Sequence, residues 1–362
     1  MSHKRILIAA GGTGGHVYPA LAVAENLRKK DAVILWLGTE TGLEARVVPA
    51  NGYKLSTIRI KGLRGKGLLR LLLAPFVLLI AIFQAVKIIR RFKPSAVLGM
   101  GGYVSGPVGI AAWMLRVPLY IHEQNAVAGL TNRLLSPFAK LVMQGFPNTF
   151  SASSKVMTTG NPVRSDIIQA AKLSTNDVSK SPNEICLLIL GGSLGARALN
   201  RSLPPALKSL PADNNFQIWH QTGSQHLQQT QDIYRQNGLN EARVEAYIED
   251  MAAAYKWADL VLCRAGALTL AELCVCGLAS VLVPYPFAVD DHQSVNARFL
   301  SDSGAAILLP EPELQTDNLA ALLSDLWQNR PRLRSMADKT RELACFDASN
   351  RVAAVCLGGA SV

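Results

Sequence analysis

The first apolar segment of the chain ends in a glycine-rich turn that carries a histidine. The sequence ILIAAGGTGGHVYPA places four glycines around Thr13 and just before His16. Glycine permits positive φ and the close approach of a ligand, and a helix that starts there presents unpaired N–H groups that suit phosphate. Histidine accepts a proton near neutral pH because its unperturbed pKa is about 6.5. The turn therefore predicts either a phosphate site beside a general base or a tightly packed strand–helix junction.

This turn matches neither of the common nucleotide-binding motifs. Aligning G-x-G-x-x-G at Gly12 puts Val17 at the last required glycine, and no Gly-Lys-Ser/Thr follows. Three similar segments occur later, GMGGYVSGP from Gly99, GGSLGAR from Gly191 and CRAGALTLAEL from Cys263. One such turn is typical of strand–helix packing, whereas several at strand ends indicate more than one phosphate group. We therefore expect a diphosphate-bearing ligand in each half of the chain.

The elements that must position these turns form two similar halves. ILIAAGGTGG from Ile6 and LLILGGSLG from Leu187 both predict a strand followed by two glycines, a hydroxyl residue and a further glycine. Apolar runs alternate with longer helical patterns, which is typical of parallel sheets with crossover helices. The predicted strands are 6–10, 33–37, 96–98, 119–122, 141–143, 185–190, 216–220, 244–246, 260–263, 280–283 and 306–308.

The predicted fold class is α/β, with two Rossmann-like domains whose parallel sheets face a central cleft. The first domain is expected over residues 1–163 and the second over 164–345, with a polar linker at 173–184. A C-terminal helix in 346–362 could return to the first domain. Because ligands of such sheets bind at the carboxyl ends of the strands, the cleft is the predicted site.

The composition indicates a globular protein with a basic first half. Apolar residues make up 49% of the 362 residues, and the net charge is +11. Between Glu44 and Glu123 there is no acidic residue, but there are twelve lysines and arginines. Such a patch favours an anionic partner: nucleic acid, anionic lipid or a phosphorylated substrate. The six cysteines include no C-x-x-C pair, so we expect reduced thiols, and the start of the chain predicts no export signal.

The middle of the basic region is apolar. Leu71–Val86 is sixteen residues without a charge, interrupted by Pro75 and flanked by basic runs within Lys61–Lys93. A helix that spans a bilayer needs roughly 20 residues, so a helix lying on an anionic membrane surface is predicted instead. A core helix with a solvated basic flank explains the pattern equally well. Nucleic acid is not expected as a partner, because aromatic residues are few and no binding module is present.

Seven segments, in order, resemble the motifs of one family. The chain is similar, over about residues 6–297, to the bacterial peptidoglycan N-acetylglucosaminyltransferases, which are two-domain glycosyltransferases of the GT-B type. One departure is Leu194, where a polar residue is expected, so a side-chain contact to the donor is not expected there. The segments are GGTGGHVYPALAVA, LGMGGYVSGP, IHEQNAVAGLTNR, GNPVR, GGSLGARALN, YIEDMAAAYKWADLVLCRAGALTLAEL and DDHQSVNA.

The resemblance implies a reaction. The donor would be UDP-N-acetylglucosamine, bound mainly by the second domain. The acceptor would be undecaprenyl-pyrophosphoryl-MurNAc-pentapeptide, bound mainly by the first. The product is the second lipid-linked peptidoglycan precursor, formed at the cytoplasmic face of the cell inner membrane by a peripheral enzyme. Because an α-linked donor gives a β-linked product at the 4-hydroxyl of MurNAc, the reaction inverts the anomeric carbon by single displacement.

This chemistry needs a general base for the acceptor hydroxyl. His16 is assigned that role, with binding of an acceptor phosphate as the alternative. The residues before it, Thr13, Gly14 and Gly15, would supply backbone contacts to a sugar. No Asp-x-Asp motif is present, so neither a metal nor another cofactor is expected. Helix N-termini and arginine would stabilise the leaving diphosphate instead.

The resemblance also implies binding roles. Glu272 would accept hydrogen bonds from the ribose hydroxyls, and the backbone of Ile248 would hold the uracil. Ser193 would donate to phosphate and Arg164 would balance its charge. The full set of implied substrate-binding residues is Thr13, Gly14, Gly15, Asn125, Arg164, Ser193, Ile248, Ala267, Leu268, Thr269, Leu270, Ala271, Glu272 and Gln293.

Two amides in this set suit sugar hydroxyls and the acetamido group. They belong to Asn125, in HEQN, and Gln293, in DDHQ. His122 and Glu123 either orient Asn125 or form a buried structural pair, and the sequence favours neither.

Two other functions remain as alternatives. A UDP-N-acetylglucosamine epimerase shares the architecture but needs no lipid, so it leaves Leu71–Val86 unexplained beyond packing. A catalytically inert nucleotide-sugar-binding subunit would need a partner that carries the base. It is disfavoured because His16, Glu272 and both glycine sets occur in one chain.

Overall fold

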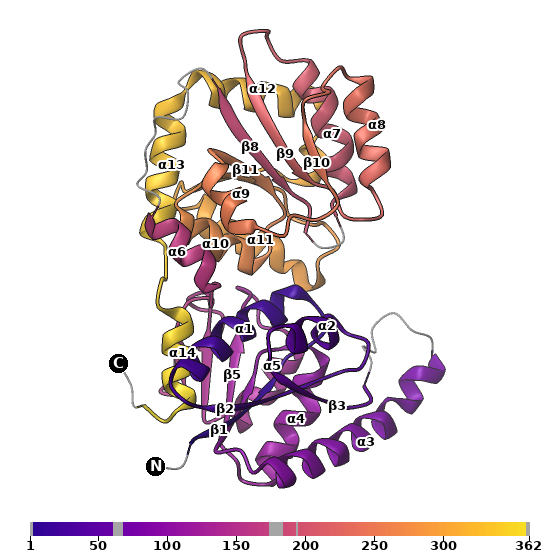
Figure 1. Ribbon diagram of the computed structural model, residues 1–362, viewed down its shortest axis with the longest axis vertical. Helices are drawn as coiled ribbons and strands as arrows, with labels where there is room; N and C mark the ends of the chain where they lie inside the picture. Colours follow the sequence, from indigo (N-terminus) through magenta and orange to yellow (C-terminus); the bar gives the residue numbers. More distant parts are fainter. Residues whose placement is uncertain (1–2, 61–67, 174–183, 193–194, 360–362) are drawn as a thin grey trace. The chain divides into compact units, whose positions relative to one another are not determined.

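The computed structural model describes residues 3–60, 68–173, 184–192 and 195–359 (Figure 1). By its internal contacts the chain divides into two compact units. The first unit is Met1–Arg164 together with Phe346–Val362, and the second is Ser165–Cys345. The predicted linker and Ser193 and Leu194 fall largely or wholly outside the described residues.

The first unit is built on a seven-stranded parallel sheet in the order β3-β2-β1-β4-β5-β6-β7. The order reverses between β1 and β4, where Ile8 pairs with Trp36 on one side and Leu98 on the other. This reversal is the topological switch point at which such sheets bind ligands. The strands are β1 (Arg5–Ala9), β2 (Val33–Gly38), β3 (Lys54–Thr57), β4 (Ala96–Gly99), β5 (Leu119–Glu123), β6 (Leu141–Gln144) and β7 (Val156–Thr158).

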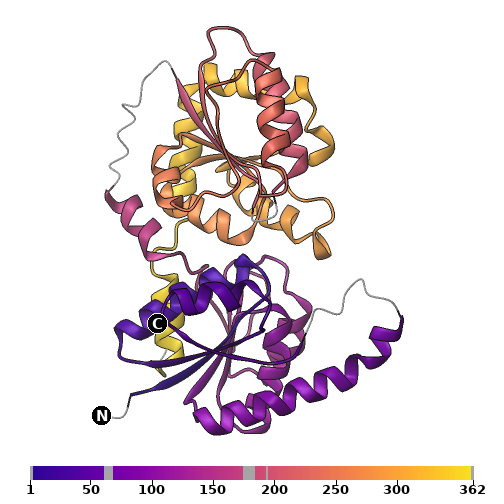
Figure 2. The ribbon, with the colours of Figure 1, turned by 45° about the vertical axis from the view of Figure 1, so that its right-hand side comes forward.

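Helices cover both faces of this sheet (Figure 2). Successive strand residues point to opposite faces, so Ile6 and Ile8 pack on one side and Leu7 and Ala9 on the other. On the first side α1 (Gly14–Lys29) and α14 (Ala348–Cys356) pack together. On the second side lie α3 (Leu68–Phe92), α4 (Gly102–Met114) and α5 (Leu130–Leu135). The remaining elements are α2 (Leu43–Ala50) and η1 (Ser136–Phe138).

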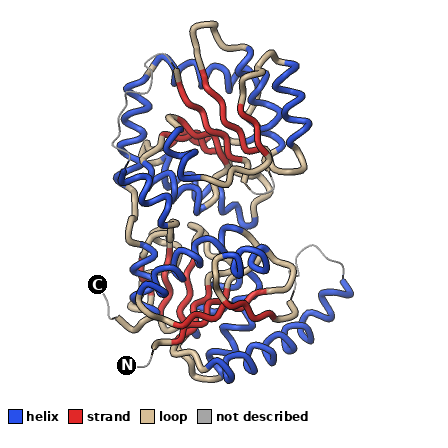
Figure 3. The backbone as a smooth tube through the Cα atoms, viewed as in Figure 1, coloured by secondary structure: helices blue, strands red, loops and turns tan. Residues whose placement is uncertain are grey.

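The second unit repeats the plan with six parallel strands in the order β10-β9-β8-β11-β12-β13. The strands, red in Figure 3, are β8 (Ile185–Leu190), β9 (Phe216–Gln221), β10 (Arg243–Glu245), β11 (Leu260–Cys263), β12 (Ala279–Leu282) and β13 (Ala306–Leu308). The helices are α6 (Ser165–Leu173), α7 (Arg197–Lys208), α8 (Leu227–Gln236), α9 (Met251–Trp257), α10 (Ala267–Cys276), α11 (His292–Ser301), α12 (Thr316–Gln328) and α13 (Arg330–Glu342), with short turns η2 (Val289–Asp291) and η3 (Glu311–Glu313).

The predicted α/β class with two Rossmann-like sheets is confirmed, and every predicted strand is found. Two strands in the described part of the chain were missed, β3 and β7. Both are edge strands, and their short, half-buried segments KLST and VMT lack the apolar run of a central strand.

The expected break at Pro75 is wrong, because α3 continues through it from Leu68 to Phe92. None of the helices in the described residues is long and apolar enough to cross a membrane.

Candidate functional site

His16 lies at the start of α1, directly beyond the carboxyl end of β1. Thr13 is the N-cap of this helix, and its carbonyl accepts hydrogen bonds from the backbone N–H groups of His16, at 3.1 Å, and Val17, at 3.2 Å. The Thr13 side chain is exposed and makes no capping bond. Gly14 and Gly15 fill the first two helical positions, where an N–H group has no acceptor within the helix. These two N–H groups are what the predicted phosphate site needs, and its phosphate role stays a prediction.

A buried carboxylate that the sequence analysis missed supports this turn. Glu44 Oε2 accepts a hydrogen bond from the backbone N–H of Gly12 at 3.0 Å. Glu44 Oε1 accepts from the N–H and the hydroxyl of Thr39 at 2.9 and 2.7 Å. A Cβ added to Gly11 would lie 2.5 Å from Glu44 Oε1, so glycine is required where the carboxylate enters. The turn is therefore built around Glu44 as well as around its glycines.

Two glycines of the GMGG segment pack against the His16 ring. Gly101 has a φ of +92° and Gly102 a φ of +76°, conformations that favour glycine. A Cβ on Gly101 would lie 2.9 Å from His16 Nδ1 and Cε1, and a Cβ on Gly102 would lie 2.5 Å from the carbonyl oxygen of Gly11. The phosphate role predicted for this segment stays a prediction. Its glycines also leave the space that the imidazole occupies.

The HEQN segment, at the end of β5, reaches His16 through Gln124. His16 Nδ1 lies 3.0 Å from Gln124 Oε1, and Gln124 Nε2 lies 3.2 Å from His122 Nδ1. His122 Nε2 lies 3.0 Å from the carbonyl oxygen of Gly160. Burial lowers the pKa of His122 to about 4, so its ring is neutral at pH 7. Gln124 was quoted in the motif but given no role.

Glu123 organises the loop that carries Asn125. Its Oε1 accepts from the backbone N–H of Asn125 at 3.0 Å and from Asn125 Nδ2 at 3.2 Å. Its Oε2 accepts from the N–H of Gly129 at 3.0 Å and from Asn132 Nδ2 at 2.8 Å. Of the two readings that the sequence left open, the first is right for Glu123, which orients Asn125. His122 contacts Gln124 instead.

Arg164 belongs to the first unit and lies beside the helix that carries His16. Its guanidinium carbon is 5.5 Å from the centre of the Tyr18 ring, on α1. A guanidinium over an aromatic face is an attractive arrangement that holds the cation in place. Arg164, the cation expected to balance a phosphate, is therefore held against Tyr18, which lies two residues after His16 on α1.

In the second unit the predicted phosphate turn opens α10. Gly266 is the N-cap, and Ala267, Leu268 and Thr269 fill the first three positions, whose N–H groups have no acceptor within the helix. The backbone N–H of Leu270 already donates to the carbonyl of Gly266 at 3.0 Å. The Leu270 side chain is fully buried and Ala271 is half-buried. The first three residues thus present the N–H groups, and the next two anchor the helix.

Glu272 is buried on the same helix and held by a tyrosine that the sequence analysis missed. The hydroxyl of Tyr255, on α9, donates to Glu272 Oε2 at 2.8 Å. Burial, with the nearby Glu272 carboxylate, raises the pKa of Tyr255 well above its usual value. Tyr255 therefore stays protonated and fixes one oxygen of the carboxylate proposed to bind a ribose.

Gln221, at the end of β9, links two predicted donor-binding segments. Its Oε1 accepts from the backbone N–H of Ile248 at 3.3 Å, and its Nε2 donates to the carbonyl of Gly192 at 3.1 Å. Ile248 is buried, and its N–H is engaged by this bond. Gln221 thus ties the glycine turn after β8 to the loop after β10. Ser193, next to Gly192, lies outside the described residues.

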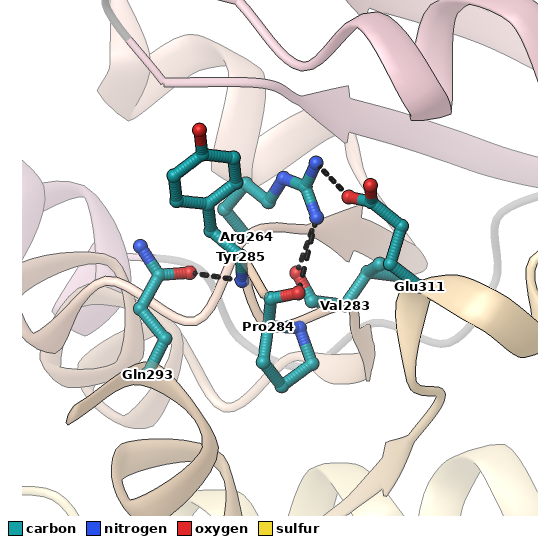
Figure 4. A network of polar contacts seen from close by, with 6 residues as sticks. All are labelled: Arg264, Val283, Pro284, Tyr285, Gln293 and Glu311. Atoms are coloured by element: carbon teal, nitrogen blue, oxygen red, sulfur yellow. Dashed lines mark hydrogen bonds and ion pairs between the residues drawn. The ribbon is translucent and has the colours of Figure 1, made fainter. Parts of the chain in front are cut away.

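Gln293 lies near an arginine that locks the loop after β12 (Figure 4). Gln293 Oε1 accepts from the backbone N–H of Tyr285 at 2.9 Å, which leaves its amide NH₂ as a donor group. Arg264 Nη1 donates to the carbonyls of Val283, at 3.2 Å, and Pro284, at 3.1 Å, and Nη2 pairs with Glu311. Arg264 therefore holds the strand end beside the segment to which Gln293 is bonded.

The structure brings the predicted residues together in two sets. In the first unit they follow the ends of β1, β5 and β7, and in the second the ends of β10, β11 and β12. Within the described residues no group of three or more histidine, cysteine, aspartate or glutamate side chains is placed to hold a metal ion. The first set offers an imidazole, amides and helix N–H groups, and the second a helix N-terminus and a fixed carboxylate. Together these groups suit a hydroxyl acceptor and a nucleoside diphosphate.

Comparison with known proteins matches each half of the chain to a domain of the same glycosyltransferase family. Residues 6–144 match the glycosyltransferase family 28 N-terminal domain, and residues 186–352 match the glycosyltransferase family 28 C-terminal domain. The chain is 52% identical over 359 residues to the UDP-N-acetylglucosamine–N-acetylmuramyl-(pentapeptide) pyrophosphoryl-undecaprenol N-acetylglucosamine transferase of Nitrosococcus oceani, with 99% of each chain covered.

Solved structures of two enzymes are similar to this chain over nearly its full length. The crystal structure of Acinetobacter baumannii MurG is 42% identical, with a TM-score of 0.82 that covers 98% of this chain and 99% of that one. A UDP-GlcNAc 2-epimerase from Neisseria meningitidis, solved with UDP-GlcNAc bound, is 15% identical, with a TM-score of 0.67 over 98% of this chain and 100% of that one. At that identity the likeness extends to the fold alone.

Proposed function

We propose, from its place in glycosyltransferase family 28, to which this chain belongs, that it transfers N-acetylglucosamine from UDP-N-acetylglucosamine to the 4-hydroxyl of MurNAc in undecaprenyl-pyrophosphoryl-MurNAc-pentapeptide. The observation that carries this proposal is 52% identity, over 99% of both chains, to a transferase named for this donor and this acceptor. The product is a lipid-linked cell-wall precursor.

The reaction is a single displacement at the anomeric carbon of the donor sugar. The MurNAc hydroxyl oxygen attacks that carbon, and its proton passes to His16. The bond from the anomeric carbon to the β-phosphate oxygen breaks, and its electron pair leaves with UDP. Because the nucleophile enters opposite the leaving group, the α-linked donor gives a β-linked product. His16 suits this role because it is half-buried beyond the carboxyl end of β1.

The second unit suits the donor. The N–H groups of Ala267, Leu268 and Thr269 would bind the diphosphate and stabilise the charge that it gains as the bond breaks. Glu272, already oriented by Tyr255, would accept the ribose hydroxyls. The backbone of Ile248, the hydroxyl of Ser193 and the amide of Gln293 would complete the site.

The first unit suits the acceptor. The backbone at Thr13, Gly14 and Gly15 would contact its sugar or its pyrophosphate, and Arg164 would balance the phosphate charge. Asn125, oriented by Glu123, would bond to a sugar hydroxyl or the acetamido group. The fourteen proposed substrate-binding residues and His16 would then form an acceptor set in the first unit and a donor set in the second.

A lipid-linked acceptor requires contact with a membrane, and α3 supplies a suitable surface. Phe76, Leu79, Ile80 and Phe83 form the apolar face of α3, with Phe76, Leu79 and Phe83 exposed by 65%, 62% and 72%. These three recur at the spacing of one helix face. Exposed Lys87, Arg90, Arg91 and Lys93 follow at the end of the helix. An apolar face beside a basic cluster is what a helix on an anionic membrane surface needs.

A second exposed apolar cluster lies on the same side of the sheet. Trp113 and Met114 end α4, which packs against α3, and Leu134 belongs to α5. The rings of Trp113 and Phe138 lie 5.0 Å apart, centre to centre. The apolar face of α3 is therefore one of two exposed apolar clusters on this side of the sheet. We propose that the enzyme is a peripheral protein on the cytoplasmic face of the cell inner membrane.

The assay that tests the function supplies radiolabelled UDP-N-acetylglucosamine with the lipid-linked MurNAc acceptor. We expect label in the lipid phase only when the acceptor is present. Release of a free epimer without transfer would instead indicate an epimerase. Binding of the donor without any turnover would indicate an inert nucleotide-sugar-binding subunit.

A further inference from the structure

A line of buried and partly buried hydrogen bonds connects His16 to a second histidine that the mechanism above does not use. It runs from the carbonyl of Gly160 to His122, then to Gln124, and ends on His16. His122 is fully buried and Gln124 is 2% exposed, whereas His16 is half-buried. The two inner members, His122 and Gln124, each use one donor and one acceptor position along the line. The direction of every bond can therefore be worked out from the fixed end.

The fixed end is the Gly160 carbonyl, which can only accept. His122 Nε2, at 3.0 Å from it, must therefore carry the proton. The neutral ring then has a lone pair on Nδ1, and burial keeps it neutral, with a pKa of about 4. Nδ1 can only accept, so the group that faces it at 3.2 Å must be the amide NH₂ of Gln124.

This orientation fixes the other end of Gln124. With its NH₂ on His122, its carbonyl oxygen faces His16 Nδ1 at 3.0 Å and must accept a hydrogen bond from the N–H at that position. Turning the amide over would place the carbonyl oxygen against the His122 lone pair, two acceptors facing each other without water, which is strongly unfavourable. His16 therefore carries its proton on Nδ1, and its lone pair is on Nε2.

The backbone around this line is also held by buried side chains. Asn161 Nδ2 donates to the carbonyl of Gln124 at 2.9 Å, and Asn132 Nδ2 donates to the carbonyl of His122 at 3.1 Å. Gly101 packs against the Nδ1–Cε1 edge of the His16 ring. The amide of Gln124 and the imidazole of His16 are thus held at both ends of their shared bond.

We propose that His122 and Gln124 are positioning residues that select the tautomer of His16 in which Nδ1 is protonated and Nε2 is the proton acceptor. The selection acts through the amide of Gln124, which transmits the hydrogen-bond direction set by Gly160. Neither residue needs to touch a substrate. This inference rests on the proposed function only in naming Nε2 as the base. The tautomer itself is a property of the protein without substrate.

The first test is ¹⁵N NMR of the histidine rings in the wild-type protein without ligand, with His16 assigned by comparison with His16→Gln. At pH 8 we expect the His16 signals of an Nδ1-protonated neutral ring and the His122 signals of an Nε2-protonated one. A His16 ring protonated mainly on Nε2 would overturn the proposal. This result does not depend on whether the protein has transferase activity.

The second test compares Gln124→Leu with Gln124→Glu. Leucine offers His16 no acceptor, so we expect a mixture of tautomers and a kcat lowered about 10- to 100-fold, with KM values changed less than about threefold. Glutamate still presents an oxygen to His16 Nδ1, so it should keep the wild-type tautomer, but its second oxygen faces the His122 lone pair, so we expect it to restore only part of kcat. A Gln124→Leu enzyme with unchanged kcat and an unchanged tautomer would refute the proposal.

The matched control is Gln144→Leu. Gln144 is a buried glutamine of the same unit, bonded to Thr158 and to the N–H of Phe150 and outside the line. We expect it to lower stability while the His16 tautomer and kcat stay as in the wild type. If the wild-type protein shows no transfer at all, the proposed function fails, while the NMR measurement still decides the tautomer.

Discussion

The backbone of Gly101 lies so close to the imidazole of His16 that a single added carbon would sit 2.9 Å from two of its ring atoms. We predict that Gly101→Ala displaces His16 and lowers kcat about tenfold, while unfolding free energy falls by about 1–3 kcal/mol. Gly106→Ala is the control, since a Cβ there would meet only Thr131 Cγ2, at an ordinary 3.7 Å. Steady-state kinetics and urea unfolding measure both. Equal kinetics for the two variants would contradict the prediction.

His16→Ala separates the two roles considered for this residue. If His16 is the base, kcat falls about 10²- to 10⁴-fold while the KM of the acceptor changes little. If it binds an acceptor phosphate, the KM of the acceptor rises and kcat at saturation is largely kept. We expect the first result. Binding of UDP, measured by calorimetry, should be unchanged in either case and serves as the test of folding.

Tyr255→Phe tests the donor side. Losing the hydroxyl that donates to Glu272 leaves the buried carboxylate less constrained. We expect the KM for UDP-N-acetylglucosamine to rise about 3- to 10-fold, with the KM of the acceptor unchanged. Tyr234→Phe is the matched control, because that hydroxyl bonds to His220 instead. A rise of the same size in both variants would show only a general loss of order in the second unit.

Leu79→Glu tests the membrane surface on α3. A carboxylate on the apolar face should lower binding to vesicles that contain anionic lipid about tenfold or more in flotation assays, because it removes apolar burial and adds repulsion. Leu173→Glu is the control, since Leu173 is also exposed but lies on α6 of the second unit. Transfer to a soluble, short-chain acceptor should be retained by both. Unchanged flotation of the Leu79 variant would exclude the surface.

Acid should destabilise both units through one buried histidine in each. Burial lowers the pKa to about 4 for His122 and to about 3 for His220. The unfolded chain binds a proton at each near pH 6.5, so stability is complete above that pH and is lost as the pH falls toward 4 and 3. Each histidine contributes a slope of about 1.4 kcal/mol per pH unit in that window.

Urea unfolding at pH 7, 6 and 5 measures that slope. His220→Asn puts an amide in place of the ring. The variant should flatten the pH dependence of the unfolding free energy for the second unit alone, whatever the effect of the substitution on stability at pH 7. An unchanged slope would show that His220 does not titrate in this range.

Features that depend on residues close together in the sequence could be predicted, whereas contacts between residues far apart in the sequence could not. The central strands and the glycine turns were predictable because apolar runs and glycines act locally. The two edge strands of the first sheet, β3 and β7, were missed because they carry no such run. His16 could be singled out by its place in a turn.

The hydrogen-bond partner of His16 could not be predicted in this way. Gln124 lies 108 residues from His16, and only the pairing of β1 with β4, and of β4 with β5, brings the two residues together. The same holds for Tyr255 with Glu272, which join α9 to α10, and for Arg264 with Glu311, which join the end of β11 to η3. Glu44 gave a weak signal, as the last acidic residue before the basic region. Nothing in its own neighbourhood indicated that the carboxylate would be fully buried.

The packing of α14 against α1 has a consequence for the order in which the protein matures. Val352, Ala353 and Cys356 complete the apolar layer under α1, and Asn26 bonds to Ser349 at 2.9 Å. During translation these side chains emerge only after all of Ser165–Cys345 has been made. The half of the protein that is synthesised first is thus finished last, and until then the apolar residues that α14 covers stay exposed on the ribosome.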